Sequence, residues 1–315
     1  MNILVVYHGE GCIDGFTSAW LATVAAERAG HEPPDLFPLT YADGQEQVLQ
    51  QRIVDKWKQQ LSYDIIYILD ISLSLQCLET LTKTTKANII MLDHHRTAFN
   101  RYVPDEPRTD NENQLLSLYD GQIQIALNNT MSGAGMAHMY FFPHEQAPLL
   151  VQHVQDRDIW RFDMQHTKAV HQYLKAQDMY IAGWSDINAM MSHDEGYRDV
   201  VREGQRLLTE WEAKIDSICE YSEWVTLQGK TGLMVRCDHQ YASDAGHLLS
   251  KISGSFGLTY CTDKADPDRK NLRVSLRSER NFDVEVMAKV YGGGGHKNAA
   301  GFVIEEYKLF SGELA

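Results

Sequence analysis

The sequence lacks paired cysteines and long apolar runs. Its five cysteines are scattered, odd in number and without a Cys-x-x-Cys pair, which argues against a disulfide framework and against a structural zinc site. No segment approaches the roughly 20 apolar residues of a membrane span. Residues 1–7 lack the basic start and the cleavage site of a signal peptide. These absences predict a cytoplasmic protein with reduced thiols and no membrane partner.

Positive charge is also scarce. The chain carries 29 lysines and arginines against 43 acidic residues, which gives a formal net charge of -14. Its overall field therefore repels phosphate backbones, and this excludes a broad basic surface for long duplex nucleic acid. An anionic substrate must instead be bound locally, by metal ions and a few arginines.

The chain does have 315 residues, 43% of them hydrophobic, which is enough for a buried core and two domains. In its first half, strand-like and helix-like segments alternate. This rhythm predicts an α/β fold with a largely parallel sheet covered on both faces. The predicted strands are 3–7, 65–69 and 88–92, and the predicted helices are 13–28, 45–60, 73–82, 136–142, 148–155 and 166–176.

A long helix is predicted from 197 to 224, where the sequence has one glycine and no proline. After it the pattern changes to strands at 233–237, 258–262 and 272–276 and to helices at 243–252 and 284–290. We therefore predict three parts. They are a catalytic metal-binding domain over 1–195, a helical linker over 196–228 and a smaller α/β domain over 229–315.

The most informative stretch is Asp93-His94-His95, which directly follows the apolar run 88–92. Other acidic and imidazole side chains follow predicted strands or lie near the ends of predicted helices. They are His8, Asp14, Asp70 and Asp156. Because the carboxyl ends of parallel strands meet at one edge of a sheet, we expect these side chains to converge.

A mixed cluster of imidazoles and carboxylates suits Mn²⁺ or a related divalent ion. Two such ions, roughly 3.5 to 4 Å apart, can bind a phosphoryl group and activate a water molecule. Each residue alone would more often cap a helix or a turn, and Asp14 could simply start the helix that follows it. Taken together, they predict phosphoester hydrolysis.

The order of these motifs resembles the DHH phosphoesterase superfamily, and specifically its members with a C-terminal DHHA1 domain, which are nanoRNase-like or exopolyphosphatase-like. The resemblance covers nearly the whole chain. It is carried by His8-x-x-x-Cys12-x-Asp14, Asp70, Asp93-His94-His95, Asp156 and the segment from Gly292 to Gly301.

The resemblance implies a two-metal site in which Asp70 bridges both ions. The ligands that it implies for the first ion are His8 and Cys12, and those for the second ion are Asp14, His94 and Asp156.

It also implies two catalytic residues. His95 would face the substrate phosphate, and Asp93 would orient a neighbouring histidine. Asp158 competes with Asp156 as a ligand. The spacing of Asp156 to the preceding helix and to Phe162 is closer to the family's fourth motif, so we prefer Asp156.

Cys12 departs from the majority pattern of the family, which has aspartate at this position. A thiolate is softer than a carboxylate and favours zinc-like ions. Cys12 is therefore either a metal ligand or a small buried thiol. We expect Mn²⁺ as the cofactor, with Zn²⁺, Mg²⁺ or Co²⁺ as alternatives.

The glycine run 292–295 can bring its backbone N–H groups close to a phosphate or a nucleotide. The resemblance implies that this loop binds substrate. Arg273 and Arg277 share one face of a predicted strand and could hold the remote part of the substrate, or they could be solvated strand positions. We expect the active site in the cleft between the domains. The candidate substrate-binding residues are Arg273, Arg277, Gly293, Gly294, Gly295 and His296.

We therefore predict a divalent-metal-dependent phosphoesterase that acts on a small phosphorylated substrate through a metal-bound hydroxide. Short oligoribonucleotides are the leading substrate, followed by cyclic dinucleotides and 3′-phosphoadenosine 5′-phosphate. Two alternatives remain. One is an exopolyphosphatase acting on inorganic polyphosphate, and the other is a nucleotide- or phosphate-binding sensor with catalysis weakened at Cys12. A homodimer is compatible with all three.

Overall fold

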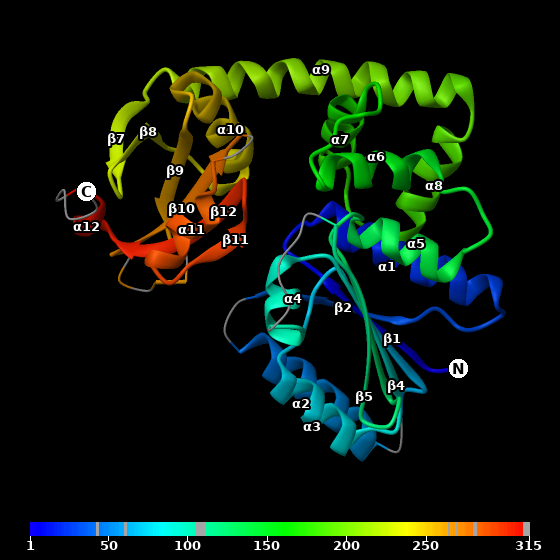
Figure 1. Cartoon of the computed structure of the whole chain (residues 1–315). Helices are drawn as coiled ribbons and strands as arrows, with labels where there is room; N and C mark the ends of the chain where they lie inside the picture. Colours follow the sequence, from blue (N-terminus) through cyan, green and yellow to red (C-terminus); the bar gives the residue numbers. More distant parts are fainter. Residues whose placement is uncertain are drawn as a thin grey trace. The chain divides into compact units, whose positions relative to one another are not determined.

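The computed structural model describes residues 1–41, 44–59, 62–104, 111–263, 265–266, 268, 270–279 and 282–310. The chain divides into two compact units, Met1–Leu208 and Thr209–Ala315. The boundary lies inside α9 (Asp194–Cys219), a long helix labelled in Figure 1. None of the helices in these described ranges is both long enough and apolar enough to cross a membrane.

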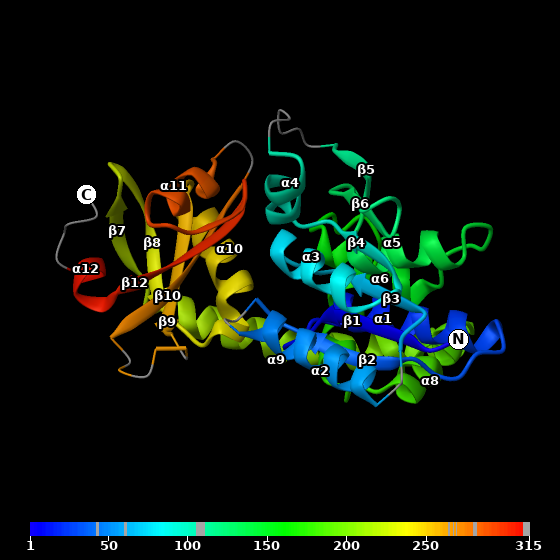
Figure 2. The same ribbon diagram turned by 90° about the horizontal axis from the view of Figure 1, so that it is seen from below.

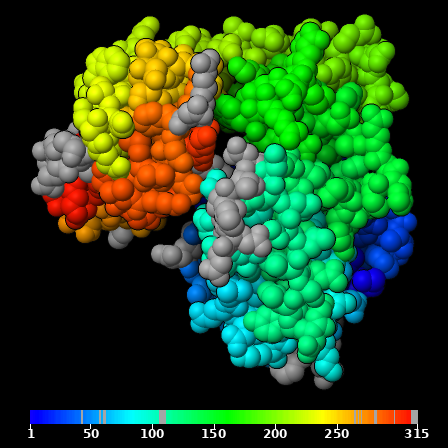
Figure 3. Space-filling view, in the orientation of Figure 1, coloured from blue at the N-terminus to red at the C-terminus, as the bar shows by residue number. Residues whose placement is uncertain are grey.

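The first unit contains a six-stranded sheet with the order β2-β1-β3-β4-β6-β5. Four strand pairs in this sheet are parallel, and β5 pairs antiparallel with β6 at one edge. Residues of β5 lie at the front of the first unit in the space-filling view (Figure 3). The strands are β1 (Ile3–His8), β2 (Asp35–Leu39), β3 (Ile65–Leu69), β4 (Asn88–Asp93), β5 (Asn113–Leu118) and β6 (Ile123–Asn128).

Helices cover both faces of this sheet because its strands are apolar on both sides. Leu4 and Val6 of β1 belong to the core beneath α2 (Gln45–Lys58) and α3 (Leu75–Thr84), which lie side by side in Figure 2. Ile3 and Val5 pack with α1 (Ile13–Arg28) on the opposite face.

The strand order creates a switch point at the centre of the sheet. The chain leaves β1 toward β2 on one side, and it leaves β3 toward β4 on the other. In open α/β sheets, ligands bind at the carboxyl ends of the strands where the order reverses in this way. The crevice beyond β1 and β3 is therefore the expected location of a site.

The other helices of the first unit pack mainly around α1 and the sheet. Trp184 of α8 is fully buried, and its indole Nε1–H donates to the Thr17 hydroxyl at 3.1 Å. These helices are α4 (Arg96–Tyr102), α5 (Gly133–Phe141), α6 (Leu149–Asp158), α7 (Thr167–Lys175) and α8 (Ile181–Met191).

The second unit has a sheet of the order β11-β12-β10-β9-β8-β7. Only the β8–β9 pair is parallel within the described residues, and α10 (Ala242–Ser253) connects these two strands. One core lies between the sheet and α11 (Val284–Val290), and another lies between the sheet, α9 and α10. The helix α12 (Glu306–Phe310) follows the last strand. The strands are β7 (Glu223–Leu227), β8 (Lys230–Arg236), β9 (Phe256–Thr262), β10 (Asn271–Ser278), β11 (Gly294–His296) and β12 (Ala299–Glu305).

Several sequence-based expectations differ from the structure, and two of them bear on the domains and the site. The helix predicted to reach residue 224 ends at Cys219, and Trp224 lies in β7, so the segment 196–228 is not helical throughout. The strand β2 was not predicted, because Pro38 interrupts its pattern. Proline is tolerated there because β2 is an edge strand of the sheet.

Candidate metal centre

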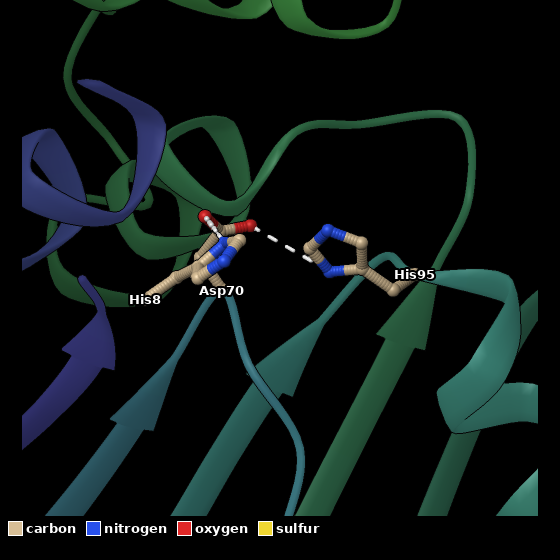
Figure 4. A group of neighbouring side chains, drawn as sticks. All are labelled: His8, Asp70 and His95. Carbon is tan, nitrogen blue, oxygen red and sulfur yellow. Dashed lines mark ion pairs between the residues drawn. The ribbon is translucent and has the colours of Figure 1, made fainter. Parts of the chain in front are cut away.

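The ends of three neighbouring strands carry the first group of candidate ligands. His8 is the last residue of β1, Asp70 follows β3, and His95 follows the end of β4. Figure 4 shows their side chains pointing toward one another beyond the strand ends. Nδ1 of His8 lies 3.4 Å from Oδ2 of Asp70, and Nδ1 of His95 lies 3.9 Å from Oδ1 of Asp70.

A second group shares Asp70 with the first. Nε2 of His94 lies 3.0 Å from Oδ1 of Asp70 and 3.9 Å from Oδ2 of Asp14. In each group the candidate ligand atoms lie within 4.8 Å of one another. The structure thus brings together two sets of donors around the Asp70 carboxylate.

Asp158, rather than Asp156, lies beside the second group. Oδ2 of Asp158 lies 3.4 Å from Nε2 of His94. Both carboxylate oxygens of Asp156 are instead used within the protein, because they accept the backbone N–H groups of Asp163 at 2.8 Å and Met164 at 3.1 Å. The preference for Asp156 over Asp158 therefore does not agree with this geometry.

Asp156 belongs to a buried hydrogen-bond network. It accepts the Thr167 hydroxyl at 2.5 Å, and that hydroxyl lies 2.9 Å from Nδ1 of His153. Nε2 of His153 lies 2.8 Å from the Tyr197 hydroxyl. The network joins α6, α7 and α9, so its contribution is to the packing of these helices.

This network predicts acid sensitivity of the fold. Burial lowers the pKa of His153 to about 4, whereas the unfolded chain takes up this proton near pH 6.5. The stabilising contribution of the neutral imidazole is therefore complete above pH 6.5 and is lost as the pH falls toward 4. For this group alone the loss is at most about 3 kcal/mol. Between pH 7 and 4.5, the free energy of unfolding measured in urea should fall less steeply with pH for His153→Gln than for the wild type. Equal pH dependences in the two proteins would contradict this role of His153.

Asp93 contacts the neighbouring His95. It is fully buried, and its Oδ1 lies 2.7 Å from Nδ1 of His95. The same oxygen accepts the backbone N–H groups of His94 at 2.8 Å and His95 at 3.1 Å. Asp93 therefore holds the turn between β4 and α4 and orients the His95 ring through Nδ1.

Asp14 is held by the start of another helix. Its carboxylate accepts the backbone N–H groups of Gly133 at 2.6 Å and Ala134 at 3.0 Å, in the first turn of α5. Free N–H groups at a helix N-terminus stabilise a carboxylate. Gly133 also lies against Asp70, since a Cβ at position 133 would meet Cβ of Asp70 at 2.4 Å.

This close approach gives a prediction for Gly133→Ala. The added methyl group must displace Asp70 or α5, so we expect a loss of about 1–3 kcal/mol of stability. We also expect weaker Mn²⁺ binding, measured by calorimetry, although no ligand has been removed. Gly135→Ala is the matched control in the same helix, because its Cβ would meet only the ends of the flexible Gln155 and Met131 side chains and neither Asp70 nor backbone. Equal Mn²⁺ affinities for the two variants would contradict the prediction.

Cys12 lies within the centre. Its thiol donates to Oδ2 of Asp70 at 3.4 Å and accepts the N–H of Gly15 at 3.4 Å, which makes Cys12 the N-cap of α1. Burial raises the pKa of the Cys12 thiol well above its usual value, and the carboxylates of Asp70, Asp14 and Asp158 raise it further. These effects favour the protonated form of this capping thiol.

The centre concentrates negative charge in a buried place. Burial raises the pKa of the Asp14 carboxyl well above its usual range, and the carboxylates of Asp70 and Asp158 add to this effect. Burial lowers the pKa of His94, but the neighbouring carboxylates outweigh burial and raise it to about 10. Groups that retain protons in this way can exchange them for a divalent cation.

The residues fit a divalent metal. Among the described residues, Nδ1 of His8 and Oδ1 of Asp70 are buried without a partner in hydrogen-bond geometry. Such unsatisfied buried atoms require an explanation, and a bound ion is one of them. Imidazole nitrogens with carboxylate oxygens form a donor set typical of Mn²⁺ and related ions.

Tyr41 is a site residue that the sequence did not reveal. Its ring lies edge-on to His8 and His95, with centroid distances of 5.5 and 6.1 Å. The residue is 51% exposed, so it forms one open wall of the centre. Its position just beyond β2 was the only available signal, and β2 itself was not predicted.

The predicted substrate residues lie in the second unit. Arg277 donates to the Ser243 hydroxyl of α10 at 2.8 Å, and Arg273 lies 3.5 Å from Asp263, with 46% of its side chain exposed. Both arginines point to the same face of β10, as predicted. Gly294 and Gly295 pair with β12 as part of β11, and Gly293 packs closely against Gly301. The His296 side chain lies outside the described residues.

Comparison with known proteins identifies the second unit. Residues 239–312 match the model of the DHHA1 domain. The chain is also 26% identical over 282 residues to oligoribonuclease NrnB of Bacillus subtilis (strain 168). That match covers 84% of this chain and 65% of NrnB, so the chain spans less than two thirds of that relative.

Solved structures share the fold at low sequence identity. The DHH domain of a member of a family of ribosomal proteins has a TM-score of 0.54 and 11% identity, over 99% of this chain and 84% of that one. RecJ of Thermus thermophilus in complex with Mn²⁺ has a TM-score of 0.52 and 12% identity, over 99% of this chain and 51% of that one.

Proposed function

We propose that this chain, a DHH-superfamily protein with a C-terminal DHHA1 domain, is a divalent-metal-dependent phosphoesterase for short oligoribonucleotides. The observation that carries this proposal is the pair of donor groups that share Asp70. The similarity to NrnB supports the choice of substrate, and the manganese complex of a protein with the same fold supports the choice of metal.

The chain's own residues have distinct roles in this proposal. Bound divalent ions would polarise phosphoryl oxygens and lower the pKa of a coordinated water. His8 and Asp70 would hold one ion, while Asp14, Asp70, His94 and Asp158 would hold the other. His95, oriented through Nδ1 by Asp93, would present Nε2 to the substrate phosphate.

The DHHA1 domain would bind the rest of the substrate. Arg273 has an exposed side chain, and Arg277 is held by Ser243 and by the Leu276 carbonyl oxygen. Guanidinium groups suit phosphate oxygens because their paired N–H groups match the geometry of an oxyanion. The glycines of β11 would add backbone N–H groups, with His296 beside them.

The test is product release from a panel of substrates. The panel contains dinucleotide to pentanucleotide RNA, cyclic dinucleotides, 3′-phosphoadenosine 5′-phosphate and polyphosphate, each with Mn²⁺, with Zn²⁺ and with chelator. We expect metal-dependent release of mononucleotides from short RNA. Phosphate release from polyphosphate alone would overturn this proposal in favour of an exopolyphosphatase, and inactivity with every metal would favour a binding protein.

Cys12→Asp tests the metal preference. A carboxylate in place of the thiol is a harder ligand, so we expect tighter Mn²⁺ binding and a lower preference for Zn²⁺. Calorimetric titration of both metals into the wild type and the variant measures this shift. Unchanged affinities for both metals would mean that position 12 only caps α1.

A further inference from the structure

The segment that follows Asp158 has an unusual backbone. Trp160 and Phe162 have φ angles of 59° and 56°, in the left-handed region that bulky side chains rarely adopt. Such conformations persist only where surrounding contacts hold them, and they are concentrated at functional sites. Contacts with other residues must therefore hold this segment, because the backbone preferences of Trp160 and Phe162 do not favour its conformation.

Asp156 supplies the contacts that hold this segment. Its carbonyl oxygen accepts the N–H groups of Arg161 at 3.0 Å and Phe162 at 3.3 Å. Its carboxylate accepts the next two N–H groups, those of Asp163 and Met164. One buried residue thus fixes the turn that carries both aromatic side chains.

The two aromatic rings are combined with cations. Trp160 and Phe162 lie edge to face, with ring centroids 5.1 Å apart. The Arg157 guanidinium lies 4.1 Å from the Trp160 centroid and 5.6 Å from that of Phe162, and Lys168 Nζ lies 5.4 Å from the Phe162 centroid. We call Arg157, Trp160, Phe162 and Lys168 the aromatic–cation cluster. Both rings are only partly buried, so they remain accessible from solvent.

The cluster carries two cations, Arg157 and Lys168, on a chain whose net charge is -14, and Asp158 and Asp163 lie in the same segment. Burial holds the pKa of His171 well below its usual value, and the nearby charges of Arg157 and Lys175 lower it further. Arg161 adds another cation in the same turn. Phosphate groups repelled by the molecule as a whole would be attracted here.

The cluster is linked to the metal centre through Asp158, within the same unit. Arg157 is adjacent to Asp158, whose carboxylate reaches His94. Arg161 donates to the carbonyl oxygen of Thr130 at 2.9 Å, in the loop before α5, the helix that holds Asp14. Figure 1 shows α6, which carries Arg157, with α5 and α7 as its neighbours.

We propose that the aromatic–cation cluster is a nucleobase-binding subsite for the nucleotide next to the scissile phosphate. The base would stack on the surface formed by Trp160 and the Arg157 guanidinium, since unpaired bases stack on both aromatic rings and guanidinium planes. Lys168 and Arg161 would neutralise the neighbouring phosphate. The inference rests on the proposed function and deepens it, because a subsite for bases selects nucleotides over polyphosphate, which has none.

The experiment measures equilibrium binding to the full-length protein in chelator, so that no turnover is needed. The ligands are the dinucleotide pApA and an abasic analogue of equal charge. The variant is Trp160→Asn, because asparagine tolerates a positive φ while removing the ring. We expect the wild type to prefer pApA by about 10-fold and the variant to lose that preference.

Two further variants control the result. Trp160→Phe keeps an aromatic ring and should retain most of the preference. Trp224→Asn makes the same change at an exposed tryptophan of β7 and should change nothing. If Trp160→Asn fails to fold, Phe162→Asn is measured in the same way.

The subsite would be overturned if Trp160→Asn weakened the binding of pApA and of the abasic analogue equally. It would also be overturned if the wild type did not prefer pApA. Failure of the proposed function has a different signature. It would appear as absence of RNA hydrolysis with every metal, whatever the binding preference.

Discussion

Asp70→Asn is expected to remove Mn²⁺ binding and to lower oligoribonucleotide hydrolysis by more than about 100-fold, since even residues that only support metal ligands cost 10- to 100-fold. The reason is that Asp70 belongs to both donor groups, so its replacement by a neutral amide weakens both metals together. Calorimetric titration of Mn²⁺ and the rate of mononucleotide release measure the two effects.

Asparagine is the informative substitution because of the backbone at Asp70. Its φ of 60° is tolerated by aspartate and asparagine but disfavours alanine, and the amide keeps the side-chain volume that lies against Gly133. Asp120→Asn is a matched control, because Asp120 is an exposed aspartate with a φ of 54°. Near-wild-type turnover in Asp70→Asn would contradict the two-metal proposal, whereas the control should keep both activity and stability.

Asp158→Asn and Asp156→Asn are expected to have opposite effects. Asp158 approaches His94 and faces the charges of Asp14 and Asp70, so its neutralisation should weaken Mn²⁺ binding by at least about 10-fold. The stability of the metal-free protein should be unchanged or higher, because repulsion between like charges decreases. Thermal unfolding with and without Mn²⁺ separates these two quantities.

Asp156→Asn should instead destabilise the fold by about 1–3 kcal/mol and leave Mn²⁺ affinity nearly unchanged. Asp156 accepts the N–H groups of Asp163 and Met164 and the hydroxyl of Thr167, and an amide NH₂ group would face one of these donors. If Asp156→Asn instead lost Mn²⁺ binding while keeping wild-type stability, Asp156 rather than Asp158 would be the metal ligand.

Local sequence patterns located the centre because strand and ligand are adjacent in the chain. The apolar runs before His8, Asp70 and Asp93 form β1, β3 and β4, which are neighbours in the sheet. Three polar residues at the ends of adjacent parallel strands must lie close together. The helix 13–28 and the strand 65–69 also have their predicted bounds, since strong hydrophobic periodicity defines both.

Other features depend on contacts between residues distant in sequence. Asp156 and Asp158 are two positions apart near the end of α6, so spacing alone cannot decide which one faces His94. Tyr41 reaches the centre from the end of an edge strand whose pattern is broken by Pro38. The sequence up to Trp224 has the composition of a helix, but Trp224 lies in β7 and pairs with Leu233 of β8.

The sequence by itself determined the α/β class of the first unit and the set of residues at its strand ends, because these follow from hydrophobic periodicity along the chain. Only the tertiary structure decided which carboxylate lies beside His94 and which glycine allows α5 to approach Asp70. It also brought together the aromatic–cation cluster that follows Asp158 in the chain. These features depend on distances between atoms of segments that are far apart in the sequence, and hydrophobic periodicity along the chain does not specify such distances.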